Sequence, residues 1–130
     1  LNYLARLGWS HGDQEIFTRD ELIAKFDWAH VGRTASQYDK KKFEYVQKEH
    51  LHHRDDADLA ARVVPWLAKR GIEVDAANAT LNAAIGPVKL RATTLEELAE
   101  GLDYFFRADD ALEYEAKGRR KFLTPELAPN

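Results

Sequence analysis

The sequence predicts an all-α fold of two small helical subdomains with little or no sheet. One observation is that capping residues precede apolar runs with helical spacing, as at Thr18 and at Thr93 or Thr94, each with a glutamate three residues later. The other is that no segment alternates apolar and polar residues over more than about four positions, as half-buried strands do.

Composition sets limits on the class of protein. The chain has 130 residues, of which 45% are hydrophobic and 32% charged, enough apolar side chain for a buried core. Cysteine is absent, which excludes disulfides, thiol chemistry and cysteine-based zinc sites and favours the cytoplasm. No apolar run is long enough to cross a bilayer, so no membrane partner is predicted, and we expect a monomer. Methionine is also absent, even at position 1, which indicates a segment of a longer protein.

Three helices are expected in the first half of the chain. The first covers residues 1–8, with Leu1, Leu4 and Ala5 on its apolar face. After a loop, Thr18 caps a second helix that runs to about residue 27. Another loop leads to a lysine-rich helix that Asp39 caps, with apolar positions at Phe43, Val46, His50 and Leu51.

Helices also dominate the second half. Acidic residues at 55, 56 and 58 begin a helix that Gly71 ends and that Pro65 should bend unless it lies near the first turns. Residues 76–85 form another, which Gly86 and Pro87 should break. A further helix begins after Thr93 or Thr94 and carries a wide apolar stripe. Thr124 marks the start of a last helix, which we expect to be truncated at the end of the chain.

A subdomain boundary is expected where residues 52–56 (HHRDD) change from basic to acidic without an apolar side chain. The predicted subdomains are residues 1–55 and 56–130.

Charge is unevenly distributed. The net charge of −3 removes the simplest argument for a nucleic-acid partner, a strongly basic domain. Residues 33–54, however, hold six basic and three acidic residues, whereas residues 92–116 hold eight acidic residues and one arginine. Lys89 and Arg91 precede that acidic segment, and four basic residues follow it, at 117, 119, 120 and 121. A ligand with many phosphates would be steered towards these basic places.

No residue pattern indicates catalysis or a metal. Gly-rich phosphate loops and the GxSxG and HExxH motifs are absent, so no catalytic residue is predicted. His50, His52 and His53 lie close together and, with Asp55 or Asp56, offer metal-ligand chemistry, but a helix end with polar histidines is the favoured interpretation. The sequence therefore predicts no metal site.

Other polar and aromatic residues have two interpretations each. The lysine run 40–42 is either a solvated helix face or a phosphate contact. Trp9, Trp28 and Trp66 either stack on bases or pack in the core, and Trp66 is expected to pack. Arg91 either reads a base edge with its rigid fork of donors or pairs with Glu96 or Glu97 on the surface.

Several segments resemble bacterial glutamyl-tRNA synthetases. Residues 2–17 (NYLARLGWSHGDQEIF) and 18–28 (TRDELIAKFDW) are similar to the part that follows the KMSKS-type loop in that family. The pattern Tyr38-Asp39-x-x-Lys42-Phe43 resembles the family's Phe-Asp-x-x-Lys-Leu, and residues 59–71 and 90–106 resemble the helices that come next. The resemblance covers nearly the whole chain.

The resemblance implies the part of a class I glutamate–tRNA ligase that binds tRNA(Glu): a stem-contact subdomain followed by the first anticodon-binding helical subdomain. The parent enzyme would use ATP and Mg, with its nucleotide-binding fold before Leu1 and its last anticodon subdomain after Asn130. By itself this piece would need no cofactor and would not form glutamyl-adenylate. A helical protein-interaction module derived from a synthetase, without RNA binding, is the alternative.

The resemblance also assigns residues to tRNA binding. Ser10 and Lys42 match positions that face the inner corner of the tRNA, and Lys89 lies in the basic place beside Arg91. Arg91 matches the arginine that reads the third anticodon base, a cytosine, in family members specific for glutamate tRNA. The family's Trp-x-Asn-x-x-Tyr appears here as Tyr45, Gln47 and His50, a departure from the pattern.

Overall fold

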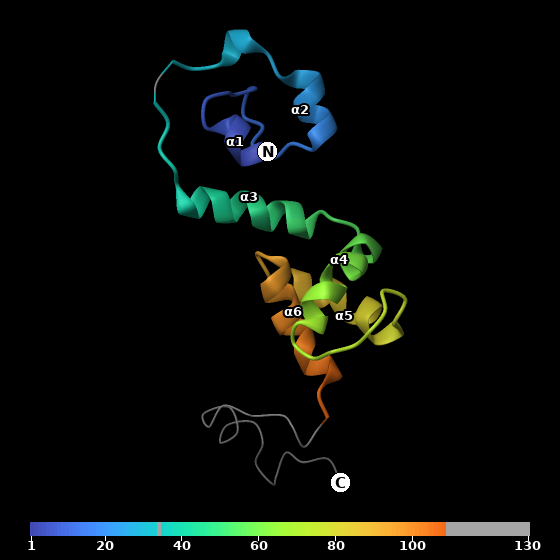
Figure 1. The fold of residues 1–130 in the computed structure, drawn as a ribbon. Coiled ribbons are helices and arrows are strands. Elements are labelled where there is room, and N and C mark those ends of the chain that lie inside the picture. Colours follow the sequence, from blue (N-terminus) through green and yellow to red (C-terminus); the bar gives the residue numbers. More distant parts are fainter. Residues whose placement is uncertain (34, 109–130) are drawn as a thin grey trace, which may run out of the picture.

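The structure, a computed structural model, describes residues 1–33 and 35–108, and the regular elements of this part are helices joined by turns and loops (Figure 1). The α-helices are α1 (Asn2–Arg6), α2 (Arg19–Lys25), α3 (Lys40–His52), α4 (Asp56–Ala68), α5 (Ala79–Lys89) and α6 (Leu95–Asp103). Two short 3-10 helices are η1 (Trp28–His30) and η2 (Tyr104–Phe106). Extended pairing in this part is limited to two isolated bridges, Trp9 with Val31 and His11 with Gln14. The predicted all-α fold is confirmed.

The expected helix start at Thr124 and the basic residues at 117, 119, 120 and 121 lie outside the described residues.

Side-chain caps place the helix starts where the sequence predicted them. Thr18 accepts the backbone N–H of Glu21 at 3.2 Å, and the Glu21 carboxylate accepts that of Thr18 at 2.8 Å, a complete capping box. Asp39 caps α3 by accepting the backbone N–H three residues on at 3.1 Å. At α6, the side-chain oxygen of Thr94 accepts the backbone N–H of Glu97 at 3.1 Å. These local predictions are confirmed.

Glycine and proline do not break α5. The expected end at Gly86 and Pro87 is wrong, because α5 continues to Lys89. A Cβ at Gly86 would lie 3.2 Å from Oδ2 of Asp56, so the glycine permits a close approach to the start of α4. Pro87 is exposed and removes only one backbone hydrogen bond. In the same way α4 includes Pro65 and ends only before Gly71, whose φ of 81° is left-handed.

The face that α1 buries differs from the expected one. Leu1 and Leu4 are 81% and 67% exposed, whereas Asn2 and Tyr3 are buried. The prediction of a Leu1–Leu4–Ala5 apolar face is therefore wrong. A five-residue helix is too short for periodicity to fix its orientation, and hydrogen bonds from one buried side chain do so instead.

That side chain is the amide of Asn2. Its Nδ2 donates to the carbonyl of Glu15 at 2.9 Å, and its Oδ1 accepts the backbone N–H of Phe17 at 2.8 Å. The same oxygen lies 2.9 Å from Nε2 of His50 in α3, which therefore carries the proton and donates. One amide thus joins α1, the segment at residues 15–17 and α3.

The chain has two apolar clusters, one in the N-terminal segment and one among α4, α5 and α6. These two groups of elements lie on either side of α3 (Figure 1). The smaller is formed by Trp9, Phe17 and Leu22. The larger unites α4, α5 and α6, and includes Leu51 from the end of α3; its largest fully buried side chains are Leu59, Val63, Leu67, Leu81, Ile85, Leu98 and Leu102. Trp66 packs against this larger cluster, as expected.

Replacing Asn2 by alanine is expected to destabilise the chain by about 1–3 kcal/mol, because the buried N–H of Phe17 and the partly buried carbonyl of Glu15 lose their partner. The measurement is urea denaturation. Leu4→Ala, on the same helix, is the matched control and should change the free energy of unfolding by less than about 0.5 kcal/mol. Equal losses for the two variants would contradict the hydrogen-bonded role of Asn2.

Gly101→Ala is expected to destabilise the α5–α6 contact, because its Cβ would lie 2.6 Å from Cγ1 of Val88, a stiff branched side chain. Overpacking of this kind costs about 1–3 kcal/mol, which outweighs the gain of about 1 kcal/mol in helix propensity. Val88→Ala should cost less in the Gly101→Ala background than alone, as thermal unfolding of the double-mutant cycle will show. A more stable Gly101→Ala variant would be incompatible with this packing.

Candidate nucleic-acid interface

Lys42 lies in the first turn of α3 and reaches back to the N-terminal segment. Its Nζ is 2.8 Å from Oε1 of Glu15, and the same oxygen is 3.4 Å from Nη2 of Arg6. The hydrogen bond from Lys42 and its charge lower the pKa of Glu15 below the ordinary value of 4.5. Sequence reasoning did not include Glu15 and Arg6, which are distant from Lys42 along the chain and become neighbours only through the fold.

Ser10 follows the turn after α1 and is exposed. It stands between Trp9, which is 3% exposed, and His11, whose ring stacks on that of Trp9 at 5.9 Å between centroids. The buried tryptophan therefore fixes the backbone on both sides of the Ser10 hydroxyl.

Lys89 closes the end of α5 against the start of α4. Its Nζ donates to Oδ1 of Asp56 at 2.5 Å and to the carbonyl of Arg54 at 3.0 Å. Its side chain is only 16% exposed. The structure thus places Lys89 in a joint between helices, and its contact with tRNA stays a prediction.

Arg91 follows α5 and is exposed. Only its backbone N–H is engaged, by the carbonyl of Val88 at 3.0 Å; its guanidinium contacts no acidic group among the described residues. The Glu97 carboxylate instead accepts the N–H of Thr93 at 2.8 Å. The surface pairing with Glu96 or Glu97 is therefore not formed.

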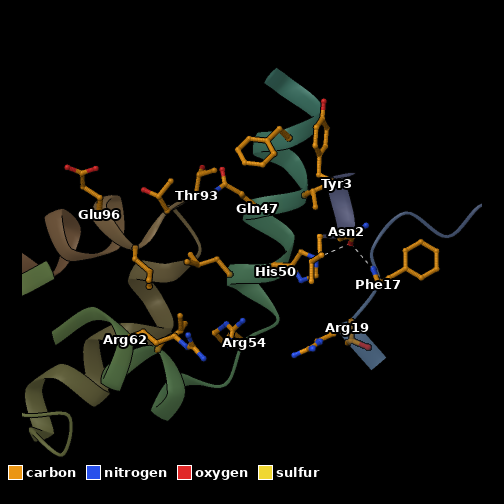
Figure 2. A pocket seen from close by; sticks show the side chains of 18 of the residues that line it. Asn2, Tyr3, Phe17, Arg19, Gln47, His50, Arg54, Arg62, Thr93 and Glu96 are labelled. Atoms are coloured by element: carbon orange, nitrogen blue, oxygen red, sulfur yellow. Dashed lines mark hydrogen bonds between the residues drawn. The ribbon is translucent and has the colours of Figure 1, made fainter. Parts of the chain in front are cut away.

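A cleft with a volume of about 820 Å³ separates the N-terminal segment and α3 from α4 and the start of α6 (Figure 2). Its walls include apolar side chains from both sides, such as Leu22, Phe43 and Leu95. Three arginines also line it, Arg19, Arg54 and Arg62. Sequence reasoning did not connect them, because they belong to three separate segments.

The histidines do not converge. His50 bonds to Asn2 at the wall of the cleft, and burial, helped by the nearby charge of Arg54, lowers its pKa below 6.5, so it is neutral at pH 7. His53 instead lies 2.7 Å from the carbonyl of Glu49. Within residues 1–33 and 35–108, no group of three histidine, aspartate or glutamate side chains could hold a metal ion.

The tryptophans differ in exposure. Trp9 is buried and Trp66 is partly covered, but Trp28 is 81% exposed, with Phe26 against its edge. None of the helices in the described part is long and apolar enough to cross a membrane.

Comparison with known proteins gives a consistent result. The profile of the anticodon binding domain family matches residues 58–129, more than half of the chain. The chain belongs to this anticodon-binding domain family.

Similar proteins are glutamate–tRNA ligases. The chain is 48% identical over 110 residues to the ligase of Burkholderia ambifaria, and the aligned region covers 82% of this chain and 23% of that ligase. It is 51% identical over 100 residues to the ligase of Bordetella parapertussis, and the aligned region covers 77% of this chain and 20% of that ligase. The fold matches a crystal structure of a glutamate tRNA ligase from Elizabethkingia meningosepticum in complex with its amino acid, with a TM-score of 0.80 and 27% identity over 96% of this chain and 24% of that one. The chain thus spans about a quarter or less of the length of these relatives.

The anticodon-binding family match divides the candidate residues. Lys89 and Arg91 fall inside residues 58–129, whereas Ser10 and Lys42 precede them. The structural match covers nearly the whole chain and so includes both groups. The resemblance to glutamyl-tRNA synthetases that the sequence indicated is confirmed.

The carboxyl pKa of Glu15, followed by NMR, is expected to rise towards its ordinary value of 4.5 in Lys42→Met, because the largest cause of its lowering is removed. The folded-state pKa is lowered, so the stabilisation by this ion pair is present above about pH 4.5 and is lost as the pH falls through the lowered value. Lys40→Met is the matched control, since Lys40 pairs with Glu44. An unchanged Glu15 pKa in Lys42→Met would contradict the ion pair.

Proposed function

We propose that this chain is the tRNA-binding part of a bacterial glutamate–tRNA ligase, an ATP-dependent class I synthetase that joins glutamate to tRNA(Glu). The observation that carries the proposal is the combination of the anticodon-binding family match with ligase relatives 48% and 51% identical to the chain. In such an enzyme, ATP and Mg belong to the nucleotide-binding fold, and no cofactor is assigned to these 130 residues. We also propose a monomer that works in the cytoplasm.

The proposed division of labour follows the two apolar clusters. Residues 1–55, with the cluster around Trp9 and Phe17, form a stem-contact subdomain, and residues 56–130 form the first anticodon-binding subdomain. Ser10 and Lys42 serve the first, where hydroxyl and ammonium groups donate to phosphate and ribose oxygens. Lys89 and Arg91 serve the second, with Arg91 as the base reader because its guanidinium is exposed and unpaired among the described residues.

Filter binding of tRNA(Glu) over a salt series tests the proposal. Binding should weaken linearly with the logarithm of salt concentration, as expected when basic side chains displace counterions from phosphates. A folded protein that binds no tRNA at any salt concentration would favour the interaction-module alternative.

Lys42→Ala is expected to weaken binding of cognate and non-cognate tRNA alike and to reduce the salt slope by about one contact, because a phosphate contact carries affinity but little sequence information. Glu15→Gln should have the opposite effect, since it removes the carboxylate that holds the Lys42 ammonium. Lys69→Ala, whose ammonium lies over the ring of Trp66, is the control. Selective loss for one tRNA in Lys42→Ala would contradict a backbone contact.

Arg91→Gln is expected to narrow the ratio of kcat/KM between glutamate and glutamine tRNA by about ten- to a hundredfold, measured in the intact enzyme. Cytosine offers the acceptors O2 and N3 to the donors of arginine, whereas guanine offers N1–H and an amino group, so that donor would face donor. Arg91→Lys keeps the charge without the planar fork and should lose discrimination while keeping the salt slope. A ratio that stays unchanged in Arg91→Gln would remove Arg91 from base reading.

A further inference from the structure

Three guanidinium groups gather at one end of the cleft. Arg19 comes from the first position of α2, Arg54 from the connection between α3 and α4, and Arg62 from α4. Figure 2 shows Arg19 directed towards the side of the cleft where Arg54 and Arg62 lie. They therefore approach one opening from both sides of the joint between the two apolar clusters.

Two of these arginines are held in place by a single carboxylate. Oδ2 of Asp58 lies 2.6 Å from Nη1 of Arg54 and 2.9 Å from Nε of Arg62. Hydrogen bonds from Arg62 and then Arg54 lower the pKa of Asp58, so it stays charged well below neutral pH. Asp58 lies four residues after Arg54, which precedes α4, and four residues before Arg62, which is within α4, so its carboxylate contacts both side chains.

The donors that remain suit phosphate oxygens. Arg62 uses only its Nε towards Asp58, and Arg54 only its Nη1, which leaves their other N–H groups without a protein partner among the described residues. Arg19 makes no hydrogen bond or ion pair there. A guanidinium offers several donors in a rigid plane that matches the oxygens of a phosphate.

The side chains that line this cleft carry more positive than negative charge. Among the described residues, three arginines and one carboxylate line it, and that carboxylate, of Glu96, lies at the far end from the arginines (Figure 2). The neighbouring His50 is neutral. Because the whole chain has a net charge of −3, this local excess marks a place where an anion is favoured over the rest of the surface.

We propose that Arg19, Arg54 and Arg62 bind consecutive backbone phosphates of the tRNA and so seat one strand of it across the joint between the two subdomains. This inference rests on the proposed function and adds to it a site outside Ser10, Lys42, Lys89 and Arg91. Asp58 acts as a positioning residue, because it orients two of the three guanidinium groups without facing the RNA. Since phosphates look alike in every tRNA, the site contributes affinity and register and does not discriminate sequences.

The test is binding of an unmodified tRNA(Glu) transcript to the intact protein over a salt series. Arg19→Gln, Arg54→Gln and Arg62→Gln should each lower the salt slope by about 0.7–0.9 and raise Kd about five- to tenfold at 0.1 M salt, and the triple variant should combine these losses. Arg33→Gln, an exposed arginine outside the cleft, is the matched control. Arg19→Lys keeps the charge and should retain the slope.

The outcomes separate the two proposals. If the unchanged protein binds no tRNA, the proposed function and this inference both fall. If it binds tRNA and the triple variant matches Arg33→Gln, the arginine site alone is overturned, as it would be if the cleft received an acidic protein segment. Arg54 and Arg62 both pair with Asp58, so thermal unfolding is used to check that the triple variant is folded. If it is not, Arg19→Gln, which breaks no contact within the described residues, decides the question by its salt slope.

Discussion

The amide of Asn2 is the interaction on which the arrangement of the N-terminal half depends. It donates to the carbonyl of residue 15, accepts from the N–H of residue 17 and accepts a hydrogen bond from Nε2 of His50, so α1, the segment after it and α3 share one hydrogen-bonded centre. A buried amide tolerates few alternative neighbours, because each unpaired polar group would cost free energy. The position of α3 then follows, and with it the wall of the cleft and the place from which Lys42 reaches Glu15.

Elements of the fold that depend on local chemistry could be predicted from the sequence. The caps at Thr18, Asp39 and Thr94 act within three residues, so their pattern is visible without the tertiary structure. The exposed Leu4 and the unbroken passage through Pro87 could not be predicted, because each is decided by what packs against it. Tertiary contacts override weak local preferences in short helices and near single prolines.

At the candidate site, the sequence indicated which basic residues are involved, whereas the residues that contact them are known only from the fold. Motif similarity picked out Lys42 and the charge distribution picked out Lys89, but only the fold shows that Glu15 and Asp56 hold their ammonium groups, 27 and 33 residues away along the chain. The exposed guanidinium of Arg91 matches its predicted place on the surface. The arginines of the cleft carry no local motif, since their spacing in the sequence says nothing of a shared opening.

Carboxylates in this chain orient basic side chains as well as offsetting their charge. Glu15 contacts Lys42, Asp56 contacts Lys89, and Asp58 contacts two arginines, so three carboxylates lie directly against candidate basic side chains. A carboxylate that binds one edge of a guanidinium leaves its other donors aimed in a set direction, which reduces the side-chain entropy lost when a phosphate binds. A net negative charge is therefore compatible with a polyanionic partner. Recognition depends on the direction of the hydrogen-bond donors that have no protein partner, and the net charge of −3 gives no information on that direction.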